Sequence, residues 1–142
     1  MKVSKLSTDD YIDFGLIGLV STVKEYKLVW HINRITHFEL EKRKDIQIDF
    51  SNNIRIAVSN FSYQTQHLCV EMLKNRLLQA NNRAYQYLLE EIKQFDYLIK
   101  YKDESEQTDI KDVLSLLKSI NQIEYAAILE PANIKSRDNL IF

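Results

Sequence analysis

An alternating run close to residue 100 constrains the fold more than any other stretch of the sequence. Phe95, Tyr97, Ile99 and Tyr101 recur at every second position. Successive side chains of a β-strand point to opposite faces, so this spacing places all four on one face of a strand. The chain is therefore predicted to contain a sheet with a strongly apolar and aromatic face.

Two amphipathic segments are predicted to be the helices that accompany this sheet. Thr22 followed by Glu25 has the form of a capping box and predicts a helix over about residues 22–36. Thr108 or Asp109 is predicted to cap a second helix over about residues 108–121. Their apolar stripes consist of Leu28, Val29, Ile32 and Ile35 in the first helix, and of Ile110, Val113, Leu114, Leu117 and Ile120 in the second.

Further strands are predicted before, between and after the helices. Residues 11–20 are apolar at both parities, which is typical of a strand buried on both faces. This strand holds Gly15 and Gly18, and we expect the first helix to cross it there, because glycine weakens a strand unless something packs closely over it. Residues 123–129 are predicted to be the last strand, which Pro131 ends.

The middle of the chain is less regular. Residues 38–50 alternate over too great a length for one strand of a small domain, so a bend is expected near residues 42–45. Residues 54–63 change parity around Ser59, which predicts a bulge. Residues 66–94 have a helical period and contain neither glycine nor proline, so local propensity favours a helix there.

Length and charge limit the classes of protein to consider. The 142 residues are enough for one domain, 1–142, with its own core, and 45% hydrophobic residues are ordinary for a globular protein. The 19 basic and 20 acidic side chains nearly cancel, so no global field attracts nucleic acid or an anionic membrane. No apolar window is long enough to cross a membrane. Cys69 is the single cysteine, and we expect a cytoplasmic protein.

The candidate chemistry is sparse, and no cofactor or metal is predicted. The sequence has only two glycines, which excludes a glycine-rich phosphate loop. His67 and Cys69 are two residues apart, which places an imidazole and a thiol on one strand face, although a buried cysteine is more often a small apolar side chain. Glu90, Glu91 and Asp96 could hold an acid and base pair, whereas turn carboxylates more often accept hydrogen bonds from backbone N–H groups or face water.

A basic stripe marks the first predicted helix. Lys24, Lys27, His31 and Arg34 recur on the side opposite the apolar stripe, where they could bind an acidic partner protein or RNA. A solvated helix face is the commoner reason for such a pattern. The neutral net charge argues against RNA, because neutralised phosphates supply most of that affinity.

One segment resembles a known family. Residues 89–97 read LEEIKQFDY and resemble the I-P-E-x-x-x-V-D-Y motif of a family of small bacterial proteins. Glu91, Asp96 and Tyr97 match by identity, and Glu90 stands in the place of the proline. The resemblance implies a hairpin over about residues 61–76 in place of the helix that local propensity favours. It implies no enzymatic activity.

Together these observations predict an α+β fold. We expect a single, mostly antiparallel sheet of five or six strands with both helices on one face, in an elaborated ferredoxin-like arrangement. The other face would be open to a partner, and Leu140, Ile141 and Phe142 should dock on the fold or on a second copy. The first hypothesis is therefore a non-catalytic homodimeric interaction module. The alternative is a small-ligand sensor or enzyme with a pocket around Glu91, Asp96 and Tyr97, joined by His67 and Cys69.

Overall fold

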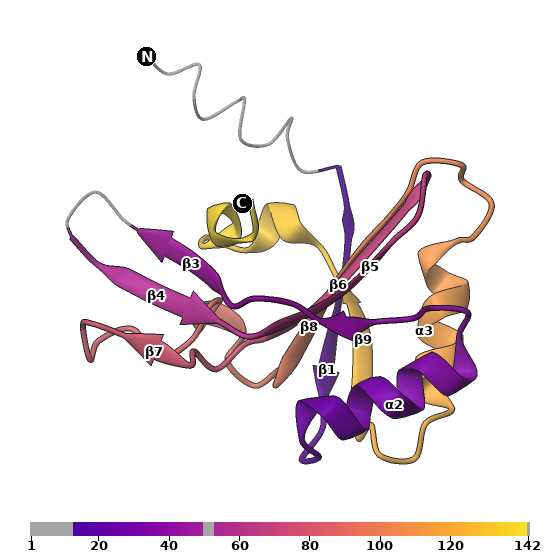
Figure 1. Ribbon diagram of the computed structural model, residues 1–142, viewed down its shortest axis with the longest axis horizontal. Coiled ribbons are helices and arrows are strands. Elements are labelled where there is room, and N and C mark those ends of the chain that lie inside the picture. The colour runs from indigo at the N-terminus through magenta and orange to yellow at the C-terminus, as the bar shows by residue number, and fades with distance from the viewer. Residues whose placement is uncertain (1–12, 50–52, 142) are drawn as a thin grey trace.

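A six-stranded antiparallel sheet is the centre of the computed structural model, which describes residues 13–49 and 53–141 (Figure 1). Strand β8 lies inside this sheet, between β6 and β1, and contains Tyr97, Ile99 and Tyr101, which share one buried cluster. Phe95 precedes the strand and packs in a different buried cluster, so the prediction that all four residues share one face was wrong for Phe95. The strands, in spatial order, are Glu41–Lys42 (β2), Asn60–Gln64 (β5), Leu68–Lys74 (β6), Tyr97–Asp103 (β8), Gly15–Val20 (β1) and Tyr125–Leu129 (β9).

Both helices, α2 (Glu25–Ile35) and α3 (Ile110–Lys118), pack on the same face of this sheet, as predicted (Figure 1). Leu28 and Ile32 of α2 and Leu117 of α3 are fully buried against Ile17 and Ile99 of the sheet. Burial of each such side chain contributes roughly 1.5–3 kcal/mol, so this layer is a major source of stability.

The two helix starts differ in how well the sequence predicted them. Asp109 caps α3, and its side chain accepts a hydrogen bond from Lys111 N at 3.0 Å, as expected. The capping box at Thr22 was wrong, because α2 begins at Glu25 and has no side-chain cap. Glu25 instead accepts a hydrogen bond from Ser59 Oγ at 2.8 Å, so a contact distant in sequence takes the carboxylate that the local motif would use.

A second, three-stranded sheet was not predicted, so the expectation of a single sheet was wrong. It consists of β3 (Ile46–Asp49), β4 (Arg55–Val58) and β7 (Gln79–Ala80), in the order β3-β4-β7. The change of parity near Ser59 is the point where the chain leaves this sheet and enters β5 of the main one. Asn60 fixes the crossing, because its buried side chain donates to Lys44 O at 2.6 Å.

The second face of the main sheet is covered, which corrects the expectation that it lies open to a partner. Ile56 and Val58 of the small sheet pack with Leu98 of β8 in a second buried cluster. Leu140 joins this cluster and is fully buried, so the C-terminal segment docks on its own chain. Two short 3-10 helices, η2 (Pro131–Asn133) and η3 (Arg137–Leu140), carry it there.

The segment 66–94 is not helical as local propensity suggested. Strands β5 and β6 form the hairpin that the family resemblance implied, with Gln64 paired to Cys69 at its end. The chain then runs through β7 and one short 3-10 helix, η1 (Glu90–Ile92), before it enters β8. The bend expected near residues 42–45 is confirmed, because β2 ends at Lys42 and β3 begins at Ile46.

The first helix was expected to cross β1 at its two glycines, and this was wrong, because other side chains pack over Gly15 and Gly18. A β-carbon on Gly15 would meet the side chain of Ile110 in α3, the second helix. A β-carbon on Gly18 would lie 2.6 Å from the ring of Phe95. The predictions made for residues 11, 12, 50 and 142 lie outside the described residues.

Candidate functional site

The three residues of the family motif serve to hold neighbouring loops. Asp96 Oδ2 accepts a hydrogen bond from Ser21 N at 2.9 Å. Glu91 Oε1 accepts hydrogen bonds from the backbone N and the hydroxyl of Ser136, in the C-terminal segment. The hydroxyl of Tyr97 donates to Val23 O at 2.8 Å, just before α2. One oxygen of each carboxylate therefore accepts a hydrogen bond from another loop of the protein.

Asn75 binds the backbone of residues 89–95 and was not predicted from the sequence. Its side chain is fully buried at the end of β6. Nδ2 donates to Phe95 O at 3.0 Å and to Ile92 O at 3.2 Å, and Oδ1 accepts from Leu89 N at 2.9 Å. One amide thus binds three backbone groups in and on either side of η1 and adds to the few hydrogen bonds that this short helix makes itself. Periodicity does not reveal it, because local propensity placed this residue inside a helix.

Tyr97 has the most strongly shifted pKa in this region. Burial, together with the nearby carboxylates of Glu25 and Asp96, raises the pKa of the phenol to about 12. The folded protein therefore holds the neutral ring more firmly than the unfolded chain, in which the pKa is 10.0. The resulting stability is fully present below pH 10 and is lost as the pH rises through the folded pKa.

We predict an alkaline destabilisation that a Tyr97→Phe substitution reduces. The wild-type free energy of unfolding should fall by roughly 2 kcal/mol as the pH rises from about 10 to about 12. The Tyr97→Phe protein should lose about 1 kcal/mol near neutral pH, because the bond to Val23 O is gone, and should show a smaller alkaline fall. Urea unfolding followed by circular dichroism over this pH range measures both. Parallel alkaline losses in the two proteins would contradict the assignment.

His67 and Cys69 lie at the other end of the sheet from the motif. Leu68 of β6 pairs with Asp103, whereas Lys74 pairs with Tyr97, so a full strand length separates the two groups. Burial raises the pKa of the Cys69 thiol, and the charge of Glu71 adds to this effect. A nucleophilic cysteine needs a lowered pKa, so this thiol is not activated. The structure does not bring the five predicted pocket residues together.

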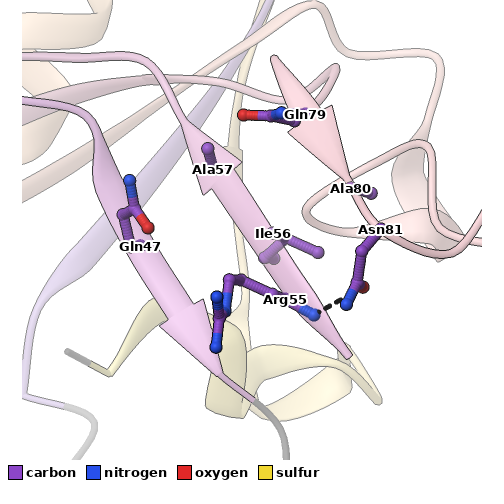
Figure 2. A pocket seen from close by; sticks show the side chains of 7 residues that line it. All are labelled: Gln47, Arg55, Ile56, Ala57, Gln79, Ala80 and Asn81. Carbon is purple, nitrogen blue, oxygen red and sulfur yellow. Dashed lines mark hydrogen bonds between the residues drawn. The ribbon is translucent and has the colours of Figure 1, made fainter. Parts of the chain in front are cut away.

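A cavity of about 390 Å³ lies on the small sheet (Figure 2). Arg55 N donates to Asn81 Oδ1 at 2.8 Å, and Arg55 Nε donates to Asp49 Oδ1 at 2.9 Å, so these polar groups already serve the sheet. Among the described residues that line it, there is no histidine, cysteine or carboxylate that could act as an acid or a base. It consists of Gln47, Arg55, Ile56, Ala57, Gln79, Ala80 and Asn81, and cross-strand neighbours such as these carry no local sequence signal.

The basic stripe and two aromatic residues share the solvent side of α2. Lys24, Lys27 and Arg34 are exposed, whereas His31 is partly buried. Lys24 is the residue that precedes the first turn, so the helical part of the stripe begins at Lys27. The guanidinium of Arg34 lies 4.7 Å from the ring centre of Trp30, which is itself exposed. Of the predicted basic side chains, Arg34 and His31 contact the ring of Trp30.

Strand β9 forms one edge of the main sheet. It pairs with β1 on one side, and no strand among the described residues pairs with it on the other. Its sequence, YAAIL, contains no charge, and Tyr125 and Ile128 are exposed. The aromatic ring of Tyr125 also stacks on Phe95, with 6.1 Å between ring centres. The apolar character of β9 was visible in the sequence, but its place at the edge depends on the strand order.

Comparison with known proteins adds no family or function. No family model, curated protein or solved structure matches the chain. The resemblance of residues 89–97 to the I-P-E-x-x-x-V-D-Y family therefore stays a prediction. Among residues 13–49 and 53–141, no helix is long and apolar enough to cross a membrane. No group of three or more histidine, cysteine or carboxylate side chains in the same residues could hold a metal ion.

Proposed function

We propose that the protein is a non-catalytic homodimeric interaction module, in which two copies pair along β9. The observation that carries the proposal is the unprotected edge of the main sheet. An edge strand presents a row of backbone N–H and C=O groups that another strand can pair with. In β9 these groups are accompanied by Tyr125 and Ile128, which are 58% and 39% exposed. Pairing would bury this apolar surface and satisfy the backbone groups.

The opposite edge of the sheet supports the choice of β9. Strand β2 is two residues long, and both Glu41 and Lys42 are charged and exposed. Lys42 also forms an ion pair with Asp45 at 3.0 Å. Short length and charged side chains are the features by which proteins keep edge strands from pairing. Strand β9 has neither feature, since it is five residues long and uncharged. Pairing with another strand is therefore favoured at β9 and disfavoured at β2.

A second copy is the partner that fits this edge best. Antiparallel pairing of β9 with itself creates a two-fold axis, so the same surface serves both copies and the assembly closes as a dimer. The six strands of one main sheet would then continue into the six of the other. The second face of the main sheet, which was first expected to form the dimer contact, is covered by the small sheet. The proposed dimer contact is therefore the edge strand β9.

The strand order supports the predicted ferredoxin-like arrangement as part of this proposal. Strands β9, β1, β8 and β6 are neighbours in that order, all antiparallel, and α2 and α3 cover one face. A split β-α-β unit repeated twice has this order. We regard β2, β5 and the small sheet as additions to it. We also infer a cytoplasmic location, which the free Cys69 supports.

The alternative of a small-ligand sensor or enzyme draws less support. Glu91, Asp96 and Tyr97 bind other loops of the protein, and among the described residues they do not line the cavity on the small sheet. The cavity of about 390 Å³ offers polar contacts without a group suited to proton transfer. A binding role for it remains compatible with the dimer.

A lysine on β9 is expected to weaken dimerisation at least tenfold. In an Ile128→Lys dimer, the new lysines of the two copies would lie close to the two-fold axis and repel each other. Natural edge strands use lysine in the same way to prevent pairing. Leu116→Lys on α3 is a matched control, because Leu116 is 40% exposed and Ile128 is 39% exposed. Sedimentation equilibrium at micromolar concentration measures the dissociation constants. Equal dimerisation of the two variants, or a wild-type chain that remains monomeric, would contradict the proposal.

A further inference from the structure

We propose that the solvent face of α2 binds an acidic segment of a partner protein, with Trp30 as the central contact. This inference is independent of the β9 pairing, since it concerns a different element. Trp30 and Tyr26 are 54% and 66% exposed, although large aromatic side chains on a helix normally face the core. Two exposed aromatic residues on one helix face therefore indicate a surface made for contact.

The arrangement of the side chains joins these aromatics to positive charge. Tyr26 and Trp30 are four residues apart, and so are Trp30 and Arg34, which places all three along one side of the helix. Lys27 lies three residues before Trp30 and is exposed on the same side. The core contacts of α2, by contrast, are made by Leu28, Val29 and Ile32. The result is an aromatic strip with two cations beside it.

The residue types indicate how such a strip recognises a partner. Tryptophan, tyrosine and arginine are the residues most often found to dominate the binding energy of protein interfaces. The guanidinium of Arg34 is already held over Trp30, with 4.7 Å to the ring centre, so less side-chain freedom is lost when it receives a carboxylate. The strip thus offers a rigid apolar contact flanked by charges that select acidic side chains.

An acidic protein segment fits this surface better than a nucleic acid does. Two exposed cations in the helix can neutralise few phosphates, and the chain as a whole has a net charge of −1. Affinity for nucleic acid rises with the number of phosphates neutralised, so this face would bind it weakly. Carboxylates that alternate with apolar side chains match both the charge and the aromatic surface.

Trp30 is the single tryptophan of the chain, so its fluorescence reports binding without a label. The probe is a peptide of alternating glutamate and phenylalanine, long enough to span the 11 residues of α2, which rise about 16 Å. We expect a saturable change in Trp30 emission at micromolar peptide, weakened at least tenfold when salt is raised from about 0.05 to about 0.5 M. The same peptide with lysine in place of glutamate should leave the emission unchanged.

Variants locate the contact on α2. With a dye on the peptide and anisotropy as the readout, Trp30→Ala and Arg34→Glu should each weaken binding at least tenfold. Lys111→Glu, which changes an exposed cation of α3, should change it less than twofold, and circular dichroism checks that each variant is folded. Equal losses in the α2 and α3 variants, no wild-type response up to millimolar peptide, or tighter binding of oligothymidine than of the peptide would each overturn the inference.

Discussion

Replacing Asn75 with leucine is expected to lower the free energy of unfolding by about 4 kcal/mol. The leucine side chain has a similar size but no polar atoms, so the carbonyl of Phe95 and the N–H of Leu89 would lose the hydrogen bonds from Asn75. The carbonyl of Ile92 would keep its bond from Phe95 N. Each buried polar group left without a hydrogen bond costs roughly 1–3 kcal/mol. Because these groups belong to the loop that leads into β8, the loss should also loosen the motif segment.

Asn81→Leu is the matched control for this experiment. Asn81 also makes two side-chain hydrogen bonds, from Arg55 N at 2.8 Å and to Asn53 O at 2.9 Å, but it is exposed. Water can replace these bonds, so the control should lose less than about 1 kcal/mol. Urea unfolding of both proteins gives the comparison. Similar stability of the Asn75→Leu protein and the wild type would show that the buried amide is not the anchor of the loop.

Gly18→Ala is expected to destabilise the protein by about 3 kcal/mol, whereas Gly15→Ala should cost less than about 1 kcal/mol. The new β-carbon at position 18 would lie 2.6 and 2.8 Å from two ring atoms of Phe95 and 2.9 Å from Leu129 Cδ1. The Phe95 ring is buried and cannot withdraw without moving its backbone. At position 15 the close neighbour is the end of the flexible Ile110 side chain, and the next atom is 3.5 Å away.

The comparison of the two alanine variants separates close packing from backbone effects. Both glycines lie in β1, and neither has a positive φ, so the intrinsic gain from alanine in a strand is alike for the two. Thermal unfolding of the two proteins under identical conditions measures the difference. Equal destabilisation of both, or a more severe effect at position 15, would mean that the contact with Phe95 does not limit the space above β1.

Local patterns predicted most of the main sheet and its helices. The alternation of Tyr97, Ile99 and Tyr101 identified β8, although Phe95 lies outside it. The helical spacing of Leu28 and Ile32 identified α2 and its buried side. These features depend on side chains that point to one face, which a chain reveals through its own periodicity. The cap of α3 was predictable for the same reason, since Asp109 bonds within its own first turn.

Contacts between distant segments were not predictable in this way. Ile54, Ile56 and Val58 alternate in the same manner whether their strand joins the main sheet or covers it. The second sheet was therefore not predicted, and neither was its packing over one face of the main sheet. Ser59 gave a sign of this change, because the parity shifts there, but a bulge and a change of sheet produce the same pattern.

The candidate sites show the same division. The motif residues Glu91, Asp96 and Tyr97 were identified, but their partners, Ser136, Ser21 and Val23, lie far away in the chain, and so their structural role was hidden. The basic side chains of α2 were visible because they follow a helical period. The contact surface of β9 requires the strand order, which no local pattern contains.

Amide hydrogen exchange along β9 reports on the proposed dimer contact itself, because it follows the backbone N–H groups of the edge strand. In an antiparallel pair, alternate N–H groups of Tyr125–Leu129 face away from β1 and are available to a second copy. We predict that these outward amides are protected at micromolar protein concentration and lose this protection on dilution, while the amides that face β1 stay protected. Rapid exchange of the outward amides at every concentration would contradict the pairing of β9 with β9, whatever mass the protein has in solution.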